Sequence, residues 1–179
     1  MRRWPVADPI AATALLGEAA VGYPGALYRL AGHPVGWFAR LIGVCERCWN
    51  VAIHSDARRR IMGVVTILIV IASAGGTALM IEHGLRTLLP NPYDWIAIAV
   101  LAIPGLAQRS LHDHLTPVLS ALRRNDLPAA RVAVGMIVGR DVAALDTPGV
   151  TGAATESLAE SFCDGVMAPA FWLIIGGLP

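Results

Sequence analysis

The 179-residue sequence contains no lysine, so all 14 of its basic Lys and Arg residues are arginines. Against 13 Asp and Glu they leave a formal net charge of +1, too weak a field to indicate nucleic-acid binding, which depends on neutralising phosphates. Cysteine is scarce as well: Cys45, Cys48 and Cys163 are too few for a secreted disulfide framework. Cys45 and Cys48 form a lone Cys-x-x-Cys without further zinc ligands. We therefore expect reduced thiols and no nucleic-acid partner.

Charge of either sign is also scarce. Charged residues make up 15% of the chain and hydrophobic ones 55%, with a mean hydropathy of +0.58, whereas roughly a quarter of a soluble domain is charged. Disorder is excluded by the same composition. GxSxG, P-loop and GxGxxG motifs are missing, so hydrolase, Walker-type ATPase and Rossmann functions gain no support. The sequence predicts an all-α protein of multipass membrane helices with one helical cytoplasmic segment.

The clearest membrane segment is the uncharged run from Ile61 to Ile81, which as a helix would span about 31 Å, the thickness of a bilayer core. Arg58, Arg59 and Arg60 precede it, so its first residue faces the cytoplasm. A second apolar run, 95–108, contains Pro104 and is followed by further arginines, which returns the chain to the cytoplasm. Residues 61–108 are thus predicted to form a transmembrane hairpin.

The N-terminal region, 1–60, combines a broken membrane helix with an amphipathic cytoplasmic stretch. The apolar run 10–30 is interrupted by Glu18 and by Gly and Pro at 22–25, which favours a broken or re-entrant helix. Pro5 and Asp8 argue against a signal peptide. Glu18 either faces a polar site or pairs with an arginine. At the other end, 165–179 is uncharged but shorter than a span, and we expect it to begin a membrane helix that is cut off.

The charged segment, 109–164, has the signals of several helix starts. Asp126 precedes Pro128, and Asp146 with Thr147 precedes Pro148. An N-cap residue followed by a proline in the first turn is typical of a helix N-terminus. We expect a helical cytoplasmic segment here.

Three carboxylates in this segment, Glu156, Glu160 and Asp164, are spaced to share one helical face. Such a row repels itself unless arginines or a divalent metal compensate, and oxygen ligands with phosphates favour Mg²⁺. Arg140 beside Asp141 could hold a phosphate or carboxylate. The competing interpretation is a solvated acidic face.

Two further clusters are candidates for anion binding. His33 could donate to a phosphate or carboxylate, or simply cap the helix that follows it. Gln108, Arg109 and Ser110 directly follow a membrane segment and could line an anionic pocket. His112 and His114 are two residues apart, which on a helix is a weak metal motif.

Five ordered blocks resemble the membrane-bound adenosylcobinamide-phosphate synthase family of cobalamin biosynthesis. The blocks are LLGEAAVGYP (15–24), GHPVGWFARLIG (32–43), AQRSLHDHL (107–115), MIVGRDVAALD (136–146) and ATESLAESFCDGVMAPAFW (154–172). The run from GRD through ESLAES to DGVMAP is the most specific. Ser161 stands where the family commonly has Asn, and family members are roughly twice as long.

The resemblance implies a multipass inner-membrane protein, a ligase that joins adenosylcobyric acid to aminopropanol or its phosphate through an amide bond, with ATP and Mg²⁺ as activators. It implies that Glu156, Glu160 and Asp164 bind metal or orient the amine, and that Asp141 orients Arg140 or acts as a base. Corrinoid and aminopropanol phosphate would be held by the remaining candidates. These are Glu18, His33, Gln108, Arg109, Ser110, Arg140 and Asp146.

Two other functions remain open from the sequence. One is a small transporter or channel subunit in which Glu18 and the acidic row line a polar path. The other is an inactive, truncated membrane partner of the late cobalamin enzymes, which binds but does not turn over.

Overall fold

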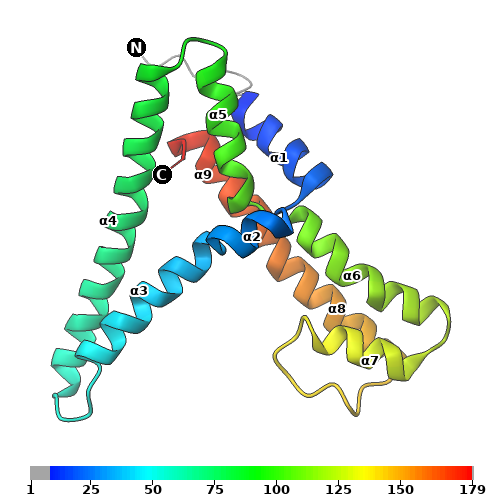
Figure 1. Cartoon of the computed structure of the whole chain (residues 1–179). Coiled ribbons are helices and arrows are strands. Elements are labelled where there is room, and N and C mark those ends of the chain that lie inside the picture. Colours follow the sequence, from blue (N-terminus) through cyan, green and yellow to red (C-terminus); the bar gives the residue numbers. More distant parts are fainter. Residues whose placement is uncertain (1–8, 179) are drawn as a thin grey trace.

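The computed structural model describes residues 9–178, and these fold into helices without a strand, which confirms the all-α prediction for this part of the chain. The expectations on residues 1–8 lie outside it. In Figure 1 the helices form an inverted V: α3 and α4 make one arm, α6, α7 and α8 the other, and α1, α5 and α9 meet at the apex. The bounds are α1 Pro9–Val21, α2 Gly25–Ala31, α3 Pro34–Trp49, α4 Asp56–Leu88, α5 Tyr93–Ala102, α6 Gln108–Arg123, α7 Leu127–Gly135, α8 Thr147–Phe162 and α9 Ala168–Gly176.

The first arm is dominated by α4, a helix of 33 residues with a mean hydropathy of 2.4 in its most apolar window. It begins at Ser55, whose hydroxyl accepts a hydrogen bond from the Arg58 amide at 3.4 Å. At its far end, Arg86 pairs with Glu82 at 2.8 Å one turn apart, which favours continuation beyond the apolar run. The predicted span, 61–81, therefore lies inside a longer helix.

The apex is a core of small and branched residues from three helices. Small residues on α1 and α5 let the two helices approach closely, and α9 closes the core. The break predicted in the N-terminal apolar run is confirmed, because α1 ends at Val21 and Gly22 takes a φ of +64°, which glycine adopts at no steric cost. Helix α5 stops at Ala102, and Pro104 lies in a 3₁₀ turn instead of kinking a longer helix. The buried core residues are Ile10, Ala11, Ala14, Ile98, Ala99, Ala102, Leu106, Ala170 and Leu173.

The second arm has its own core between α6, α7 and α8. Both predicted helix starts are confirmed: Asp126 accepts from the Ala129 amide at 3.0 Å, and Asp146 accepts from the Gly149 amide at 2.9 Å. The buried residues are Val118, Ala121, Ala130, Val134, Val150, Ala153 and Ala154. This core fixes α8, which carries the acidic row.

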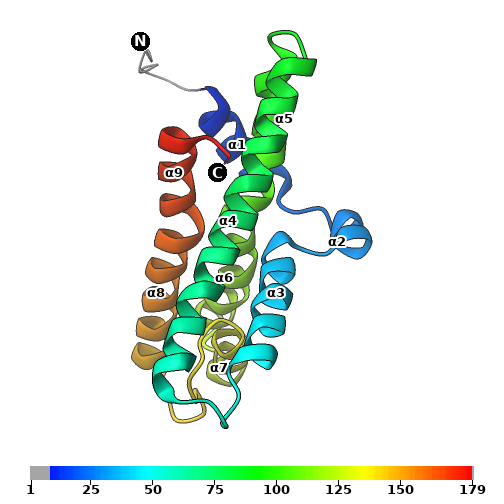
Figure 2. The same cartoon turned by 90° about the vertical axis from the view of Figure 1, so that its left-hand side faces the viewer.

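Helices α8 and α9 are joined by a π-helical turn, Cys163–Met167, into one helical rod, visible along its whole length in Figure 2. The rod runs without interruption across 164/165, where the sequence suggested a boundary between the cytoplasmic segment and a membrane helix. A Cβ on Gly165 would stand 3.1 Å from the Cβ of Ala107, so glycine permits the close crossing with the start of α6. The rod, Thr147–Gly176, and α4 are the two helices of the described chain long and apolar enough to cross a membrane.

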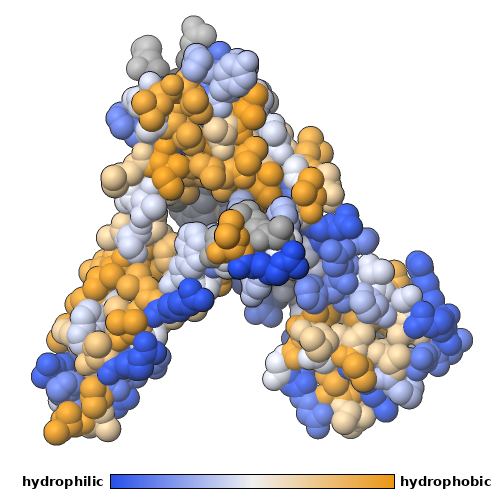
Figure 3. All heavy atoms as spheres, viewed as in Figure 1, coloured by the Kyte–Doolittle hydropathy of each residue, from blue (hydrophilic) through white to orange (hydrophobic). Residues whose placement is uncertain are grey.

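Apolar and polar side chains separate along the two arms. In Figure 3, hydrophobic residues cover the apex and much of the left-hand arm, while hydrophilic ones lie at the centre of the molecule, along the right-hand arm and toward the lower end of the left-hand arm. Arg58, Arg59 and Arg60 lie in the first turns of α4 at one free end. At the other, beside α7, helix α6 ends in Arg123 and Arg124. The arginine-bearing ends of the two arms therefore point to the same side. Between α3, α4 and α9 lies an apolar groove of about 740 Å³.

Candidate functional site

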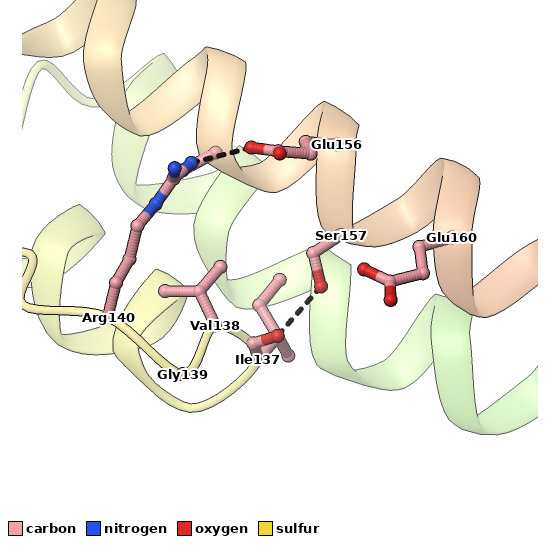
Figure 4. A pocket seen from close by; sticks show the side chains of 8 residues that line it. Ile137, Val138, Gly139, Arg140, Glu156, Ser157 and Glu160 are labelled. Atoms are coloured by element: carbon pink, nitrogen blue, oxygen red, sulfur yellow. Dashed lines mark hydrogen bonds and ion pairs between the residues drawn. The ribbon is translucent and has the colours of Figure 1, made fainter.

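The acidic face of α8 meets the loop after α7 in a pocket of about 220 Å³. Arg140, on the loop, reaches across to Glu156 on α8, with 2.7 Å between Nη2 and Oε2. Figure 4 shows these side chains pointing toward one another, with Glu160 one turn further along the helix. Both partners are exposed, 55% for Arg140 and 69% for Glu156, so the pair is accessible to a ligand. The pocket is lined by Ile137, Val138, Gly139, Arg140, Ala153, Glu156, Ser157 and Glu160.

Ser157 fixes the loop that carries Arg140. Its hydroxyl donates a 2.7 Å hydrogen bond to the carbonyl of Ile137 and is partly buried. The sequence interpretation missed this residue, although a signal existed: Val150, Ala153 and Ser157 share one helical face, and the first two are buried. A serine that continues a buried stripe needs a hydrogen-bond partner on the neighbouring element.

A second pocket, of about 230 Å³, lies on the other side of this contact and shares Ile137 and Ser157 with the first. Its other lining residues are Leu111, His114, Leu115, Met136, Leu158 and Ser161. Nδ1 of His114 lies 2.7 Å from the Ser110 carbonyl. Most side chains that line the second pocket are apolar, whereas the neighbouring first pocket is charged.

The three predicted carboxylates are not assembled into a metal site. Glu156 is paired with Arg140, Glu160 lines the pocket, and Asp164 is exposed in the π-helical turn and does not line it. The regular i, i+4, i+8 spacing assumed an α-helix, which the π turn interrupts at Cys163. Among residues 9–178, no group of three His, Cys, Asp or Glu side chains could hold a metal ion. The guanidinium of Arg140 offsets the charge of Glu156.

The other two acids of the loop bond to backbone amides. Asp141 accepts from the Ala143 amide at 2.9 Å, and the structure shows no contact between its carboxylate and Arg140. Asp146 caps α8. Both carboxylates therefore shape the loop and the helix start that flank the pocket.

Glu18 and Gln108 lie where α1 crosses the first turn of α6. The Glu18 side chain is buried, and its two oxygens lie 3.2 and 3.0 Å from the Arg109 amide nitrogen, which donates to them. The Gln108 side-chain amide donates to the Leu15 carbonyl at 2.9 Å. A Cβ on Gly22 would stand 2.8 Å from Cγ of Arg109. These contacts lock α1 to α6, and they leave Glu18 bonded to backbone without lining an open path.

The side chain of Arg109 faces Asp113 on the outside of α6. Nε lies 3.2 Å from Oδ1 of Asp113, and Nδ1 of His112 lies 3.2 Å from the same oxygen. The His112 hydrogen bond first, and then Arg109, lower the pKa of Asp113 below its ordinary value. Ser110 lies beside His114, with 3.5 Å between Oγ and Nδ1. This exposed cluster is polar but separate from the lining of the Arg140 pocket.

His33 caps α3. Its Nδ1 accepts a hydrogen bond from the Val35 amide at 3.3 Å, and its ring packs against Tyr23 with centroids 5.0 Å apart. Tyr23 in turn donates to the Gly32 carbonyl at 2.7 Å. Of the two roles considered for His33, the structure shows the cap.

The Arg140 pocket has the chemistry of an anion-binding site with adjacent general-base capacity. A guanidinium offers five N–H donors in a planar fork, and Glu156 engages Arg140 through one nitrogen. The remaining donors suit a phosphate or carboxylate. Glu160 makes no hydrogen bond or ion pair with the part of the chain that the structure describes, and its carboxylate is available to an amine or a cation.

Comparisons with known proteins place this pocket in a family context. The family model described as CobD/Cbib protein matches residues 11–179. A cobalamin biosynthesis protein CobD of Rhodobacter capsulatus is 47% identical over 163 residues, which is 90% of this chain and 50% of that protein. The proteins of the same name from a Sinorhizobium species and from Brucella anthropi are 42% and 41% identical, over 95% of this chain and 52% and 51% of their own lengths. No solved structure matches.

The chain spans about half the length of the curated relatives it matches. The matched residues include the whole Arg140 pocket and both helices that could cross a membrane. On the family match and on these identities, the chain belongs to the CobD/Cbib protein family.

Proposed function

We propose that this chain takes part in cobalamin biosynthesis, as the names of its relatives indicate, and that the Arg140 pocket contributes to amide-bond formation. The reaction joins a carboxylate of adenosylcobyric acid to the amine of aminopropanol or its phosphate. The observation that carries the proposal is the accessible Arg140–Glu156 pair with Glu160 beside it. Arginine binds the phosphate or carboxylate, and the acidic side chains attract the ammonium group.

Amide formation requires two tasks that such residues can perform. The carboxylate must be activated, because a carboxylate and an ammonium group do not condense to an amide at neutral pH. The attacking ammonium must also lose a proton. In the proposal Arg140 holds the anionic group through donors not used by Glu156, and Glu160 accepts the proton from the ammonium. Asp141, Asp146, Asp164 and the α6 residues stay outside this assignment, because their contacts with the pocket are absent or indirect.

ATP and Mg²⁺ belong to the proposal only in a limited form. ATP would supply the energy for the amide bond: transfer of its γ-phosphoryl group to the carboxylate would release ADP, and attack of the amine on the activated carboxyl group would release inorganic phosphate. The described residues do not provide a three-ligand metal site, but Mg²⁺ often takes only one or two carboxylates and completes its shell with phosphates and water. Since Glu160 is the proton acceptor and Glu156 is paired with Arg140, Mg²⁺ would be held chiefly by phosphate oxygens and water.

We also propose that the chain is a multipass inner-membrane protein. Two helices of the described chain have the length and composition of membrane spans, and the arginine-bearing ends of both arms point to one side, which is the cytoplasmic side by the positive-inside rule. Lipid covers the exposed apolar surface of α4. Corrinoid and amine would then reach the Arg140 pocket from the cytoplasm, and other late enzymes of cobalamin biosynthesis are partners on that side.

The test is conversion of adenosylcobyric acid and aminopropanol phosphate to the amide, in membranes of a host that lacks its own synthase, followed by mass spectrometry. The chain is expressed by itself and, in parallel, joined to the part of the Rhodobacter capsulatus relative that it does not cover. We expect turnover in the joined protein and at least 100-fold loss in Arg140→Ala and Glu160→Gln variants of it, the scale of a removed acid–base or anion-holding group. The exposed Glu46→Gln on α3 serves as the matched control.

Three outcomes separate the proposed function from its alternatives. Product formation that survives Arg140→Ala together with Glu160→Gln contradicts the site. Corrinoid binding without turnover, in the chain alone and in the joined protein, supports a non-catalytic membrane partner. Transport without corrinoid binding supports a transporter subunit, for which the buried and bonded Glu18 offers no open path.

A further inference from the structure

We infer that Ser157 is a positioning residue: its hydrogen bond to the Ile137 carbonyl determines where Arg140 stands relative to Glu156, and it separates the two pockets. The inference rests on the proposed function of the Arg140 pocket. It assigns Ser157 no contact with substrate.

Side-chain hydrogen bonds anchor the loop between α7 and α8 at both of its ends. Besides the Arg140–Glu156 pair and the packing of its apolar side chains on the second core, two side-chain hydrogen bonds attach the loop to the helices of this arm. Ser157 donates to the Ile137 carbonyl at 2.7 Å, and Arg131 donates through Nε to the Leu145 carbonyl at 2.6 Å. Arg140 lies between these anchors. Only the Ser157 hydrogen bond holds the start of the loop, at Ile137, three residues before Arg140.

The Arg140–Glu156 ion pair by itself does not hold the guanidinium in one position. Arg140 and Glu156 are 55% and 69% exposed, and exposed pairs between long side chains contribute little because holding them in one geometry costs side-chain entropy. Ser157 has a short side chain on the partly buried side of α8, so its hydrogen bond costs little entropy to form. The backbone anchor, more than the salt bridge, determines the position of the guanidinium.

The hydrogen bond between Ser157 and Ile137 lies between the two pockets. Ile137 and Ser157 line both the charged pocket of about 220 Å³ and the mostly apolar one of about 230 Å³, and Figure 4 shows the Ser157 hydroxyl directed at the Ile137 carbonyl along one wall of the charged pocket. If the bond is lost, the loop can move away from α8. The wall that separates the pockets then opens, and Arg140 moves with it.

The first experiment needs no turnover. Backbone amide hydrogen exchange of the 179-residue chain in detergent is compared between Ser157→Ala, Ser157→Thr and Ser161→Ala. Ser161 lies one turn further along the same helix, lines the second pocket, and has no hydrogen bond from its hydroxyl among the residues that the structure describes. We expect about tenfold faster exchange over 136–143 in Ser157→Ala, as for loss of one hydrogen bond, and native rates in the other two. Equal exchange in Ser157→Ala and Ser161→Ala would overturn the inference.

The second experiment uses the joined protein of the activity test. Ser157→Ala is expected to raise KM for aminopropanol phosphate about tenfold with a smaller change in kcat, and Ser157→Thr to restore it. In an Arg140→Ala background the same Ser157→Ala change should have no further effect, because both act through one group. Additive effects would overturn the inference. If Arg140→Ala alone leaves KM and kcat unchanged while exchange over 136–143 still responds to Ser157→Ala, the proposed function fails and the anchor stands.

Discussion

Single residues at the crossing of α1 and α6 show how a buried charge is accommodated in this chain. Glu18 is 2% exposed, and its carboxylate accepts from the Arg109 amide in the first turn of α6, where the helix dipole favours negative charge. Gly22 lets the Arg109 side chain pass close to the backbone. Residues in such contacts contribute to stability even when they resemble site residues in the sequence.

The first prediction concerns Glu18. Glu18→Ala should lower the free energy of unfolding by about 1–3 kcal/mol, because the Arg109 amide loses its acceptor in a buried place, while Glu18→Gln, which retains a carbonyl oxygen, should lower it less. Thermal unfolding in detergent measures both, with the exposed Glu46→Ala as control. Unchanged melting in Glu18→Ala together with lost substrate binding would instead make Glu18 a substrate residue.

A second prediction is the pH dependence of the Asp113 cluster. Because the pKa of Asp113 is lowered in the folded chain, its contribution to stability is fully present above the ordinary pKa of 3.8 and is lost as the pH falls through the lowered value. Asp113→Asn should therefore lessen the loss of stability on acidification below that pH. Melting temperatures of the two proteins at a series of acidic pH values measure the difference, and parallel curves would contradict the assignment.

At the scale of elements, α8 and α9 behave as one rod whose N-terminal end carries the pocket. Asp146 caps the rod, the π-helical turn changes its register in the middle, and Gly165 lets it cross α6 closely. The pocket thus has one side on this helical rod and the other on the loop after α7. Contacts at the start of the rod affect both its stability and the loop.

The prediction at this scale separates the cap from a substrate role for Asp146. Asp146→Ala should cost about 1 kcal/mol, the usual effect of losing an N-cap, whereas Asp146→Asn keeps an oxygen acceptor for the Gly149 amide and should melt like the native chain. Thermal unfolding and turnover of the joined protein are measured for both variants. Native melting with lost turnover in Asp146→Asn would show that the carboxylate is needed for substrate.

The whole molecule is an open V with two separate cores and arginines at the free ends of both arms. The apolar surface of α4 is exposed along its length, with no residue of its most apolar window buried. In water such a surface would be unfavourable, whereas in a bilayer it lies against lipid. Long-range packing is concentrated in the two cores, one at the apex and one between α6, α7 and α8.

The prediction for the whole molecule concerns its orientation in the membrane. Cys48, exposed near the end of α3, should react with a membrane-impermeant maleimide only after the cells are opened, in a background with Cys45 and Cys163 replaced by Ser. Asn91→Cys in the cysteine-free chain lies in the turn between α4 and α5, at the opposite end of α4, and should react in intact spheroplasts. Labelling of both from the same side would contradict the proposed span.

Much of the fold was predictable because its signals are local. The uncharged run 61–81, the Gly and Pro break at 22–25 and the Asp–x–Pro helix starts at 126 and 146 each depend on a few neighbouring residues, and each corresponds to an element in the structure. The ends were less predictable, since the continuation of α4 depends on the Glu82–Arg86 pair. The site was predicted only in part: Arg140, Glu156 and Glu160 come together, but Asp164 does not.

The sequence by itself determined the composition of the spans, the helix starts and the family, because hydropathy, capping and motif order are properties of the linear chain. Only the tertiary structure decided the partners of the charged groups. Glu18 meets a backbone amide 91 residues away, and Glu156 of the acidic row pairs with Arg140, 16 residues away. The chain has few ionisable side chains, and its tertiary structure decides which of them cap helices and which remain accessible in a pocket.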